Sequence, residues 1–444
     1  MTFITDLFRR TVLVPVVAAS LVIAIVLLPA VFSSASHALW QEEDGDGAPE
    51  TAYVDEENSG PELAALRKEF NQTRDRWVEA LKELRLASTM YFALPRDEAA
   101  PWKDRYEAAT QTGNIEREKF EELAVELFDR LDEPDADLLQ IILRVVKARY
   151  DRGQYTQSLE LNKKLLPFML DDDRAYMLYL SSLAMLDRYD ETREFVTRNP
   201  RILNDELIES VHEDARDNYY AIQYLHEGWI REQELREQEQ EADDLPRVQI
   251  KTSKGTITVE LFENEAPLAV NNFVALCESG FYDGLIFHRV INHFMAQTGG
   301  YDDQQQHRQL GYTIEDEFSR EDARHHFRGS LAMARTNAEH SGSSEFYFTF
   351  APKPGLDGSP LPERRGRGYT VFGRVIAGWD VLDSLTRTFE VLKGEEDERK
   401  EVPIIDAVPD HIISTTVIRK RDHEYAPTPF AGSIQMPAHH GHDH

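Results

Sequence analysis

An uninterrupted apolar run lies near the start of the chain, where residues 11–36 contain no charged side chain. A membrane-spanning helix needs about 20 apolar residues, whereas the apolar region of a signal peptide usually has about 7–15. The length of the run therefore favours a transmembrane anchor; a cleaved signal peptide is the alternative, because small residues flank His37. Arg9 and Arg10 before the run and acidic residues after it predict a cytoplasmic stub, residues 1–10. The bulk of the chain is then expected on the extracytoplasmic (periplasmic) side, or secreted if the run is cleaved.

A helical pattern of apolar and polar positions extends over residues 61–245. Its first helix is expected from Glu62 to about Leu94, after Pro61, and further helices over about 101–131 and 136–241. These runs are rich in Glu, Leu, Arg and Lys, which are good helix formers. The pattern therefore predicts an all-α domain.

Two parts of this helical region resemble each other. RGQYTQSLEL at Arg152–Leu161 aligns with LDRYDETREF at Leu186–Phe195 at an offset of 34 residues, which pairs Tyr155 with Tyr189. Thirty-four residues is the tetratricopeptide period, and the segment 147–166 resembles one tetratricopeptide unit. Because only two copies are visible and about three are needed for a continuous core, a non-repetitive helical bundle is the alternative.

The period changes to two after residue 246, where apolar and polar residues alternate on both sides of Lys254-Gly255 and predict a β-hairpin. One helix is expected at Ala266–Ser279. Short strand-like runs follow at Gly284–Val290, Phe294–Gln297, Gly329–Ala334, Glu345–Phe350, Thr370–Ile376 and His411–Arg419. Since long helices do not alternate with these strands, residues 246–421 are predicted to form a β-barrel rather than an α/β sheet.

Two segments lack the apolar residues of a packed core. Residues 37–60 are predicted to be a flexible acidic linker, and residues 422–444 a disordered tail that ends HHGHDH. The histidines of the tail are compatible with weak metal binding, but a solvated tail is the more common meaning of such a composition. No metal ligand is assigned.

The formal net charge of −31 argues against a nucleic-acid-binding surface, which requires a basic patch. Cys277 is the single cysteine, so an internal disulfide and paired-cysteine metal sites are excluded.

Three long segments of the predicted barrel carry the chemical signal: GFYDGLIFHRVINHFMAQTGG at 280–300, GSLAMARTNAEHSGSSEFYFTF at 329–350, and GLDG…GYTVFGRVIAGWDVLDSL at 355–385. Their order and content resemble the signature segments of cyclophilin-type peptidyl-prolyl cis-trans isomerases over about residues 247–419. The resemblance implies a closed antiparallel eight-stranded barrel with capping helices and a proline-binding groove on its outer face.

The chemistry of this reaction agrees with the residues present. Rotation about an X–Pro bond crosses a barrier of about 18–20 kcal/mol because it breaks amide resonance, but no covalent bond is cleaved. Such an enzyme needs an apolar slot for the proline ring and a fixed donor near the amide nitrogen, and an arginine provides a permanently charged donor. No cofactor is expected.

The resemblance implies a role for each matching residue. Arg289 is expected to be catalytic. Phe294, Met295 and Tyr347 are expected to line the proline pocket, which Leu356 and Tyr369 close. Gln297 is expected to position the peptide backbone, and Ala334 and Arg335 to meet the substrate through their main chain more than their side chains. His288 is expected to point into the barrel as a structural residue.

The sequence departs from the family pattern at two of these positions. Glu345 replaces a common glutamine, and a carboxylate accepts hydrogen bonds but cannot donate one to a peptide carbonyl. Pairing of Glu345 with Arg289 is one expected outcome. Gly355 replaces a large aromatic residue, which predicts a pocket that is more open on that side.

The leading hypothesis is a membrane-tethered, exported isomerase that assists the folding of proline-containing polypeptide clients. A catalytically weak proline-peptide-binding module is the first alternative. In the second, the helical domain is a scaffold for a protein partner and the barrel is an accessory.

Overall fold

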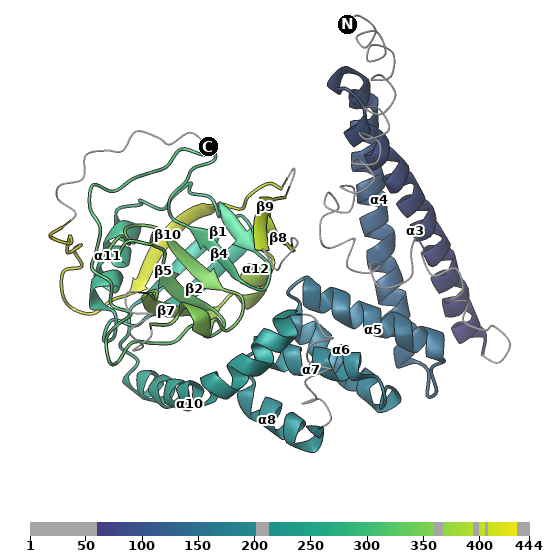
Figure 1. Cartoon of the computed structure of the whole chain (residues 1–444), viewed down its shortest axis with the longest axis horizontal. Helices are drawn as coiled ribbons and strands as arrows, with labels where there is room; N and C mark the ends of the chain where they lie inside the picture. The colour runs from purple at the N-terminus through teal and green to yellow at the C-terminus, as the bar shows by residue number, and fades with distance from the viewer. Residues whose placement is uncertain (1–59, 201–212, 359–366, 394–398, 405–406, 433–444) are drawn as a thin grey trace, which may run out of the picture. The chain divides into compact units, whose positions relative to one another are not determined.

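The protein forms two compact units, shown as a cartoon of the computed structural model in Figure 1. The structure describes residues 60–200, 213–358, 367–393, 399–404 and 407–432. The first unit contains the described residues up to Ala148 together with Pro167–Met169, and the second contains Arg149–Leu166 and those from Leu170 onward. The predicted change from helices to sheet near residue 246 therefore lies inside the second unit.

The predicted stub, membrane segment and linker, at residues 1–10, 11–36 and 37–60, lie outside the described residues except for Gly60. Across the ranges that the structure does describe, no helix combines the length and apolar character needed to cross a bilayer.

The first unit is built on two long antiparallel helices, α3 (Pro61–Ala93) and α4 (Arg96–Asp129), joined by two residues. Phe120 of α4 stacks on Phe70 with ring centroids 4.8 Å apart and also contacts Trp77, at 5.2 Å. Helical spacing places these aromatic rings on the facing sides of the two helices. The helix predicted for residues 62–94 is confirmed.

The two similar segments adopt the same local structure. Each is a helix, a turn and a helix: α5 (Ala136–Asp151) with α6 (Tyr155–Leu165), and α7 (Asp173–Met185) with α8 (Tyr189–Arg198). Gly153 and Asp187, 34 residues apart, both have left-handed backbone angles, with φ of 76° and 55°. Tyr155 and Tyr189 start the second helix of each pair and are buried.

The last long helix, α10 (Glu213–Ala242), leads into a curled mixed sheet of ten strands. The strands are β1 (Arg247–Thr252), β2 (Gly255–Leu261), β3 (Arg289–Ile291), β4 (Met295–Thr298), β5 (Ser330–Met333), β6 (Phe346–Thr349), β7 (Val371–Ala377), β8 (Phe389–Lys393), β9 (Arg399–Pro403) and β10 (Ile412–Arg419). Helices α11 (Pro267–Glu278) and α12 (Trp379–Asp383) accompany them, and we call residues 247–419 the sheet domain.

The strand order is β10-β1-β2-β7-β5-β6-β4-β3-β8-β9, and the described pairings include none between the end strands. The expected closed, eight-stranded antiparallel barrel is therefore corrected to a ten-stranded mixed sheet, in which β3 and β8 pair in parallel through Ile291 and Phe389. Strands β8 and β9 were absent from the prediction because each has only five residues and carries many charged side chains.

Alternation along the strands separates two apolar clusters. Side chains on the inner face, such as Val290, Ala296 and Phe348, pack with Phe273 of α11 in the main core. Because successive strand residues point to opposite faces, their neighbours form a second cluster on the outer face.

The main core on the inner face also includes Tyr425. The packed chain therefore continues past residue 422, where the disordered tail was predicted to begin.

Residues 433–444, which include the His-rich end considered for weak metal binding, lie outside the described part of the chain. Within the described ranges, no cluster of three or more His, Cys, Asp or Glu side chains could hold a metal ion.

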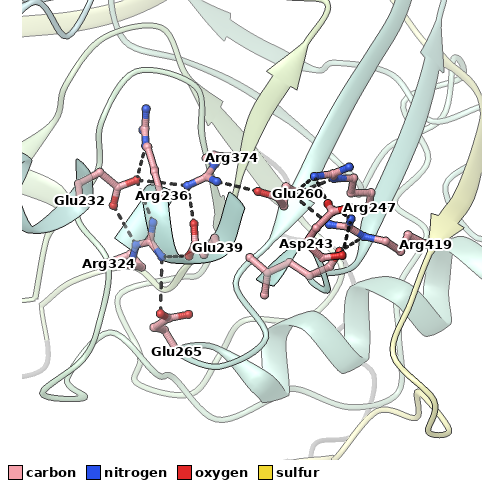
Figure 2. A network of polar contacts seen from close by, with 11 residues as sticks. Glu232, Arg236, Glu239, Asp243, Arg247, Glu260, Glu265, Arg324, Arg374 and Arg419 are labelled. Atoms are coloured by element: carbon pink, nitrogen blue, oxygen red, sulfur yellow. Dashed lines mark hydrogen bonds and ion pairs between the residues drawn. The ribbon is translucent and has the colours of Figure 1, made fainter. Parts of the chain in front are cut away.

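Acidic side chains of α10 surround the guanidinium of Arg324, whose side chain is only 1% exposed (Figure 2). Glu232 accepts two hydrogen bonds from it, both of 2.9 Å, and Glu239 accepts a third of 2.5 Å. Glu265 lies 3.5 Å away, and the ring centroid of Phe262 is 3.8 Å from the guanidinium carbon. A buried charge is tolerated only when it is paired, so the sheet domain needs α10 to neutralise this arginine.

The same row of charges continues across four neighbouring strands (Figure 2). Glu239 accepts a hydrogen bond of 2.7 Å from Arg374 of β7, which donates another of 2.6 Å to Glu260 of β2. Glu260 also pairs with Arg247 of β1 at 2.7 Å and Arg419 of β10 at 3.2 Å. Helix α10 is thereby bonded to the edge of the sheet that ends in β10.

We predict that Glu232→Gln lowers the free energy of unfolding of the full-length chain by about 3 kcal/mol, because it removes one partner of a buried charge. The midpoint of urea unfolding measures this loss. Glu237→Gln, on the exposed side of the same helix, is the matched control and should leave the midpoint unchanged. Equal midpoints for the two variants would contradict a stabilising role of the Arg324 cluster.

Candidate functional site

The register of four strands lines up the candidate catalytic residue with the residues expected to bind peptide. Arg289 of β3 is opposite Gln297 of β4, Gln297 is opposite Tyr347 of β6, and Tyr347 is opposite Ala332 of β5. Cross-strand partners lie on the same face of a sheet. The sheet thus brings together side chains from segments that are distant in sequence into one row on its outer face.

Beside this row lies an apolar group that we call the outer-face cluster. Its buried members are Leu245, Phe262, Ile291, Met295, Ala332, Ala334, Tyr347 and Val371, and Phe294, Leu356, Tyr369 and Phe389 pack against them partly exposed. All the apolar residues expected to line or close the pocket belong to this group. The additional members, which the sequence did not predict, are Leu245, Phe262, Ile291, Ala332, Val371 and Phe389.

Arg289 is held by Glu401 of β9, a residue that the sequence interpretation did not include. Its Nε donates a hydrogen bond of 2.8 Å and its Nη2 one of 2.5 Å to the two carboxylate oxygens. Nη1 faces the other way, 3.4 Å from Oε1 of Gln297 and 3.8 Å from the sulfur of Met295. The guanidinium carbon is 5.7 Å from the ring centroid of Phe294.

Glu345 pairs with residues other than Arg289, so the pairing expected from the sequence is wrong. Nε2 of Gln297 donates to one of its oxygens at 2.8 Å, and Nε2 of His307 is 2.9 Å from the other. His288 is mostly buried, with Nε2 3.5 Å from the same carboxylate, and burial lowers the pKa of its imidazole. The carboxylate therefore orients Gln297 instead of competing for the arginine.

The side chain of Arg335 makes structural contacts that the sequence interpretation, which expected its main chain to matter more for the substrate, did not include. It donates a hydrogen bond of 2.8 Å to the carbonyl of Gly368 and lies between the rings of Phe318 and Tyr369, 5.1 and 5.2 Å from their centroids. The neighbouring Ala334 donates its N–H to the carbonyl of Glu345 at 2.9 Å. Arg335 thus fixes Tyr369 at the rim of the outer-face cluster.

Gly355 is exposed, and apart from its two chain neighbours no atom of the described residues lies within 4 Å of a Cβ built on it. The expected open side of the pocket is compatible with this geometry. The inserted loop nearby, residues 359–366, lies outside the described residues.

A series of hydrogen bonds between buried polar side chains orients the hydroxyl of Tyr347. Its hydroxyl is 2.9 Å from Nε2 of His326, whose Nδ1 is 2.6 Å from Asp357. Nδ1 of His325 is 2.8 Å from the other oxygen of Asp357. Burial alone would raise the pKa of Asp357, but the hydrogen bonds from the two histidines outweigh it and leave the pKa below its ordinary value. Because Asp357 directly follows Leu356, the carboxylate that orients Tyr347 through His326 also restrains the backbone beside Leu356, a second residue of the cluster.

The turn between β3 and β4 is supported by the helical segment of the same unit. His293 has a left-handed backbone, with φ of 55°, and its Nδ1 is 2.7 Å from the hydroxyl of Tyr155. Its ring stacks on Tyr150 at 4.9 Å, and Asn292 donates a hydrogen bond to the carbonyl of Asp151. Phe294 follows directly, so the helices help to set the position of this expected pocket residue.

Sequence reasoning missed several polar residues of this site, namely Glu401, His307, His325, His326 and Asp357. Asp357 lies in the segment GLDG, which was available as a signal. Glu401 had only the weak alternation of FEVLK as an indication of its hairpin, because its role depends on a contact with a residue 112 positions away.

Comparisons with known proteins place the sheet domain beside one family. A family model described as cyclophilin type peptidyl-prolyl cis-trans isomerase/CLD matches residues 247–408. Peptidyl-prolyl cis-trans isomerase B of Escherichia coli is 37% identical over 158 residues, which are 35% of this chain and 94% of that protein. A peptidyl-prolyl cis-trans isomerase of Acinetobacter baylyi is 41% identical over 138 residues, 31% of this chain and 70% of that protein. A crystal structure of a cyclophilin type isomerase from Cryptosporidium parvum matches with a TM-score of 0.29 and 24% identity, over 40% of this chain and 99% of the other.

The pair between His325 and Asp357 predicts a pH dependence of stability. The hydrogen bond to Asp357 raises the pKa of His325 above its ordinary value, so the folded state favours the protonated imidazole. This contribution is complete below the unfolded pKa of about 6.5 and is lost as pH rises through the higher folded pKa. We expect the stability difference between wild type and His325→Gln, measured by urea unfolding, to shrink from pH 6 to pH 8.5.

His411→Gln, at an exposed position of the same domain, is the control and should show no such trend. A difference between wild type and His325→Gln that stays constant over this pH range would contradict the assignment.

Proposed function

Because the chain belongs to the cyclophilin-type peptidyl-prolyl cis-trans isomerase family, we propose that the outer-face row and cluster are its active site. The sheet domain is a peptidyl-prolyl isomerase, and Arg289 is proposed to be its catalytic residue. The observation that carries this assignment is the convergence of Arg289, Gln297 and Tyr347 in one cross-strand row beside an apolar cluster.

The geometry suits isomerisation without a covalent intermediate. The proline ring would pack against Phe294, Met295 and Tyr347, out of contact with water. Leu356 and Tyr369 would close the pocket around it. As the amide twists, its nitrogen regains a lone pair, and Nη1 of Arg289 is the donor that faces this region. The main chain of Ala334 and the side chain of Gln297 would hold the peptide on either side.

The size of the rate effect requires more than this donor. A 10⁵-fold acceleration corresponds to about 7 kcal/mol, whereas one charge-assisted hydrogen bond contributes about 1.5–3 kcal/mol. Removal of water by the outer-face cluster and fixed peptide orientation are proposed to supply the remainder. A catalytically weak proline-binding module is the second candidate, favoured by the carboxylate of Glu345 in the peptide-binding row.

We further propose that this isomerase is tethered to a membrane by residues 11–36 and acts outside the cytoplasm on proline-containing polypeptide clients, assisting their folding. The uncharged run and the acidic residues that follow it support this location. The helical region is proposed to be tetratricopeptide-like and to recruit a protein partner. Its support is the pair of helix–turn–helix segments with left-handed residues 34 positions apart.

We predict that Arg289→Ala in the full-length chain lowers kcat/KM for a proline-containing tetrapeptide by about 10- to 150-fold, as the loss of about 1.5–3 kcal/mol requires. Catalysed cis-to-trans isomerisation measures it. Arg320→Ala, which removes an arginine paired with Asp322 at the surface, is the control. Full activity of Arg289→Ala would exclude this residue as the catalytic donor.

The location is tested by expressing the full-length chain in a bacterial host and separating membrane from soluble fractions. We expect the intact chain in the membrane fraction, protected from protease added to whole cells and digested once the outer compartment is opened. A chain lacking residues 1–36 should be soluble. A soluble product that starts near Leu39 would instead show cleavage of a signal peptide, and an intact soluble chain would contradict both forms of export.

A further inference from the structure

The residue that holds Arg289, Glu401, comes from a hairpin outside the three sequence segments that point to the reaction. Its carboxylate binds one edge of the guanidinium through two donors, Nε and Nη2. Two parallel hydrogen bonds between arginine and a carboxylate define the plane of the guanidinium as well as its position. The third nitrogen, Nη1, is left facing Gln297 and Met295 at the outer-face cluster.

The hairpin that supplies Glu401 is bonded to the strand that supplies Arg289. Thr388, just before β8, accepts the N–H of Val290 with its hydroxyl at 2.9 Å and donates its own N–H to the carbonyl of Val290 at 3.0 Å. Its carbonyl accepts the N–H of Ile404, just after β9, at 2.9 Å. The start of the hairpin is therefore bonded to β3 and its end is bonded to Thr388, which restrains where the carboxylate of Glu401 lies.

The opposite side of Arg289 is also ordered. Gln297 donates its amide N–H to Glu345, and this hydrogen bond turns its oxygen toward Nη1 of Arg289. Four side chains thus form one continuous row, Glu401, Arg289, Gln297 and Glu345, which crosses the site. In this row Glu401 is the partner that restrains the arginine most tightly.

We propose that Glu401 is a positioning residue of the isomerase: it holds the Arg289 guanidinium so that Nη1 is directed at the twisting X–Pro amide. This inference rests on the proposed role of Arg289. The side chains of Arg289 and Glu401 are 29% and 41% exposed, and exposed ion pairs add little to stability. The contribution of Glu401 is therefore to order a long side chain before the substrate arrives, since an arginine otherwise has many rotamers.

The test measures kcat and KM separately for a proline-containing tetrapeptide, using the full-length chain with Glu401→Ala, Glu401→Gln and Glu401→Asp. We expect kcat to fall about tenfold in Glu401→Ala, with KM nearly unchanged because the apolar cluster is intact. Glu401→Gln, which keeps one acceptor oxygen but loses the other and the negative charge, should fall less. Glu401→Asp keeps both acceptor oxygens and should recover most of the rate.

Glu390→Gln, on the neighbouring strand of the same hairpin and opposite Val402, is the matched control and should keep the wild-type kcat. The urea-unfolding midpoint should be the same in all these variants. In the Arg289→Ala background, Glu401→Ala should cause no further loss of rate, because the group that it positions is gone.

The outcomes separate the two proposals. If Arg289→Ala loses activity but Glu401→Ala and Glu401→Gln keep or raise kcat, Glu401 restrains or competes for the arginine and the positioning role is overturned. A further tenfold loss in the double variant would also overturn it, because Glu401 would then act without Arg289. If Arg289→Ala itself stays active, the proposed active site fails, whatever the Glu401 variants show.

Discussion

The second unit depends on the neutralisation of one buried cation, Arg324. Its side chain is 1% exposed and takes its partners from α10, more than 80 residues earlier in the chain. Removing a guanidinium from water is so unfavourable that the fold must place carboxylates around it. Glu232 and Glu239 are seven residues apart on α10, so two helical turns bring both to the same side. The last helix of the helical region is thus a structural part of the sheet domain.

Alternation along the strands places the core side chains on one face of the sheet and the candidate active-site side chains on the other. On β3, β4 and β6, one face buries Val290, Ala296 and Phe348 in the main core, and the other presents Arg289, Gln297 and Tyr347. A shift of register by one residue would exchange the two sets of side chains. The strands are only three or four residues long. Their pairing is nevertheless strongly specified, because only one register places the apolar side chains in the core and the polar ones on the outer face.

Polar side chains around the outer face restrain the residues that are proposed to meet the peptide. Arg289 is oriented by Glu401, Gln297 by Glu345, and Tyr347 by His326 and Asp357. Each restrained group has a defined orientation without substrate, which reduces the ordering required when a peptide binds. Glu345 is compatible with this organisation, because a carboxylate can accept the N–H of Gln297.

The sequence by itself determined the types of most elements, the segments that resemble cyclophilin-type isomerases, and the apolar residues expected to line or close the candidate pocket. These depend on local period and on residues that lie close together in the chain, such as those of 280–300. Only the tertiary structure decided the partners of the charged residues. Arg289 is 112 positions from its partner Glu401, and Arg324 is 92 positions from its partner Glu232. A charged residue has no periodic signal that identifies its partner, and with 80 acidic residues in the chain the choice is made by which strands and helices fold side by side.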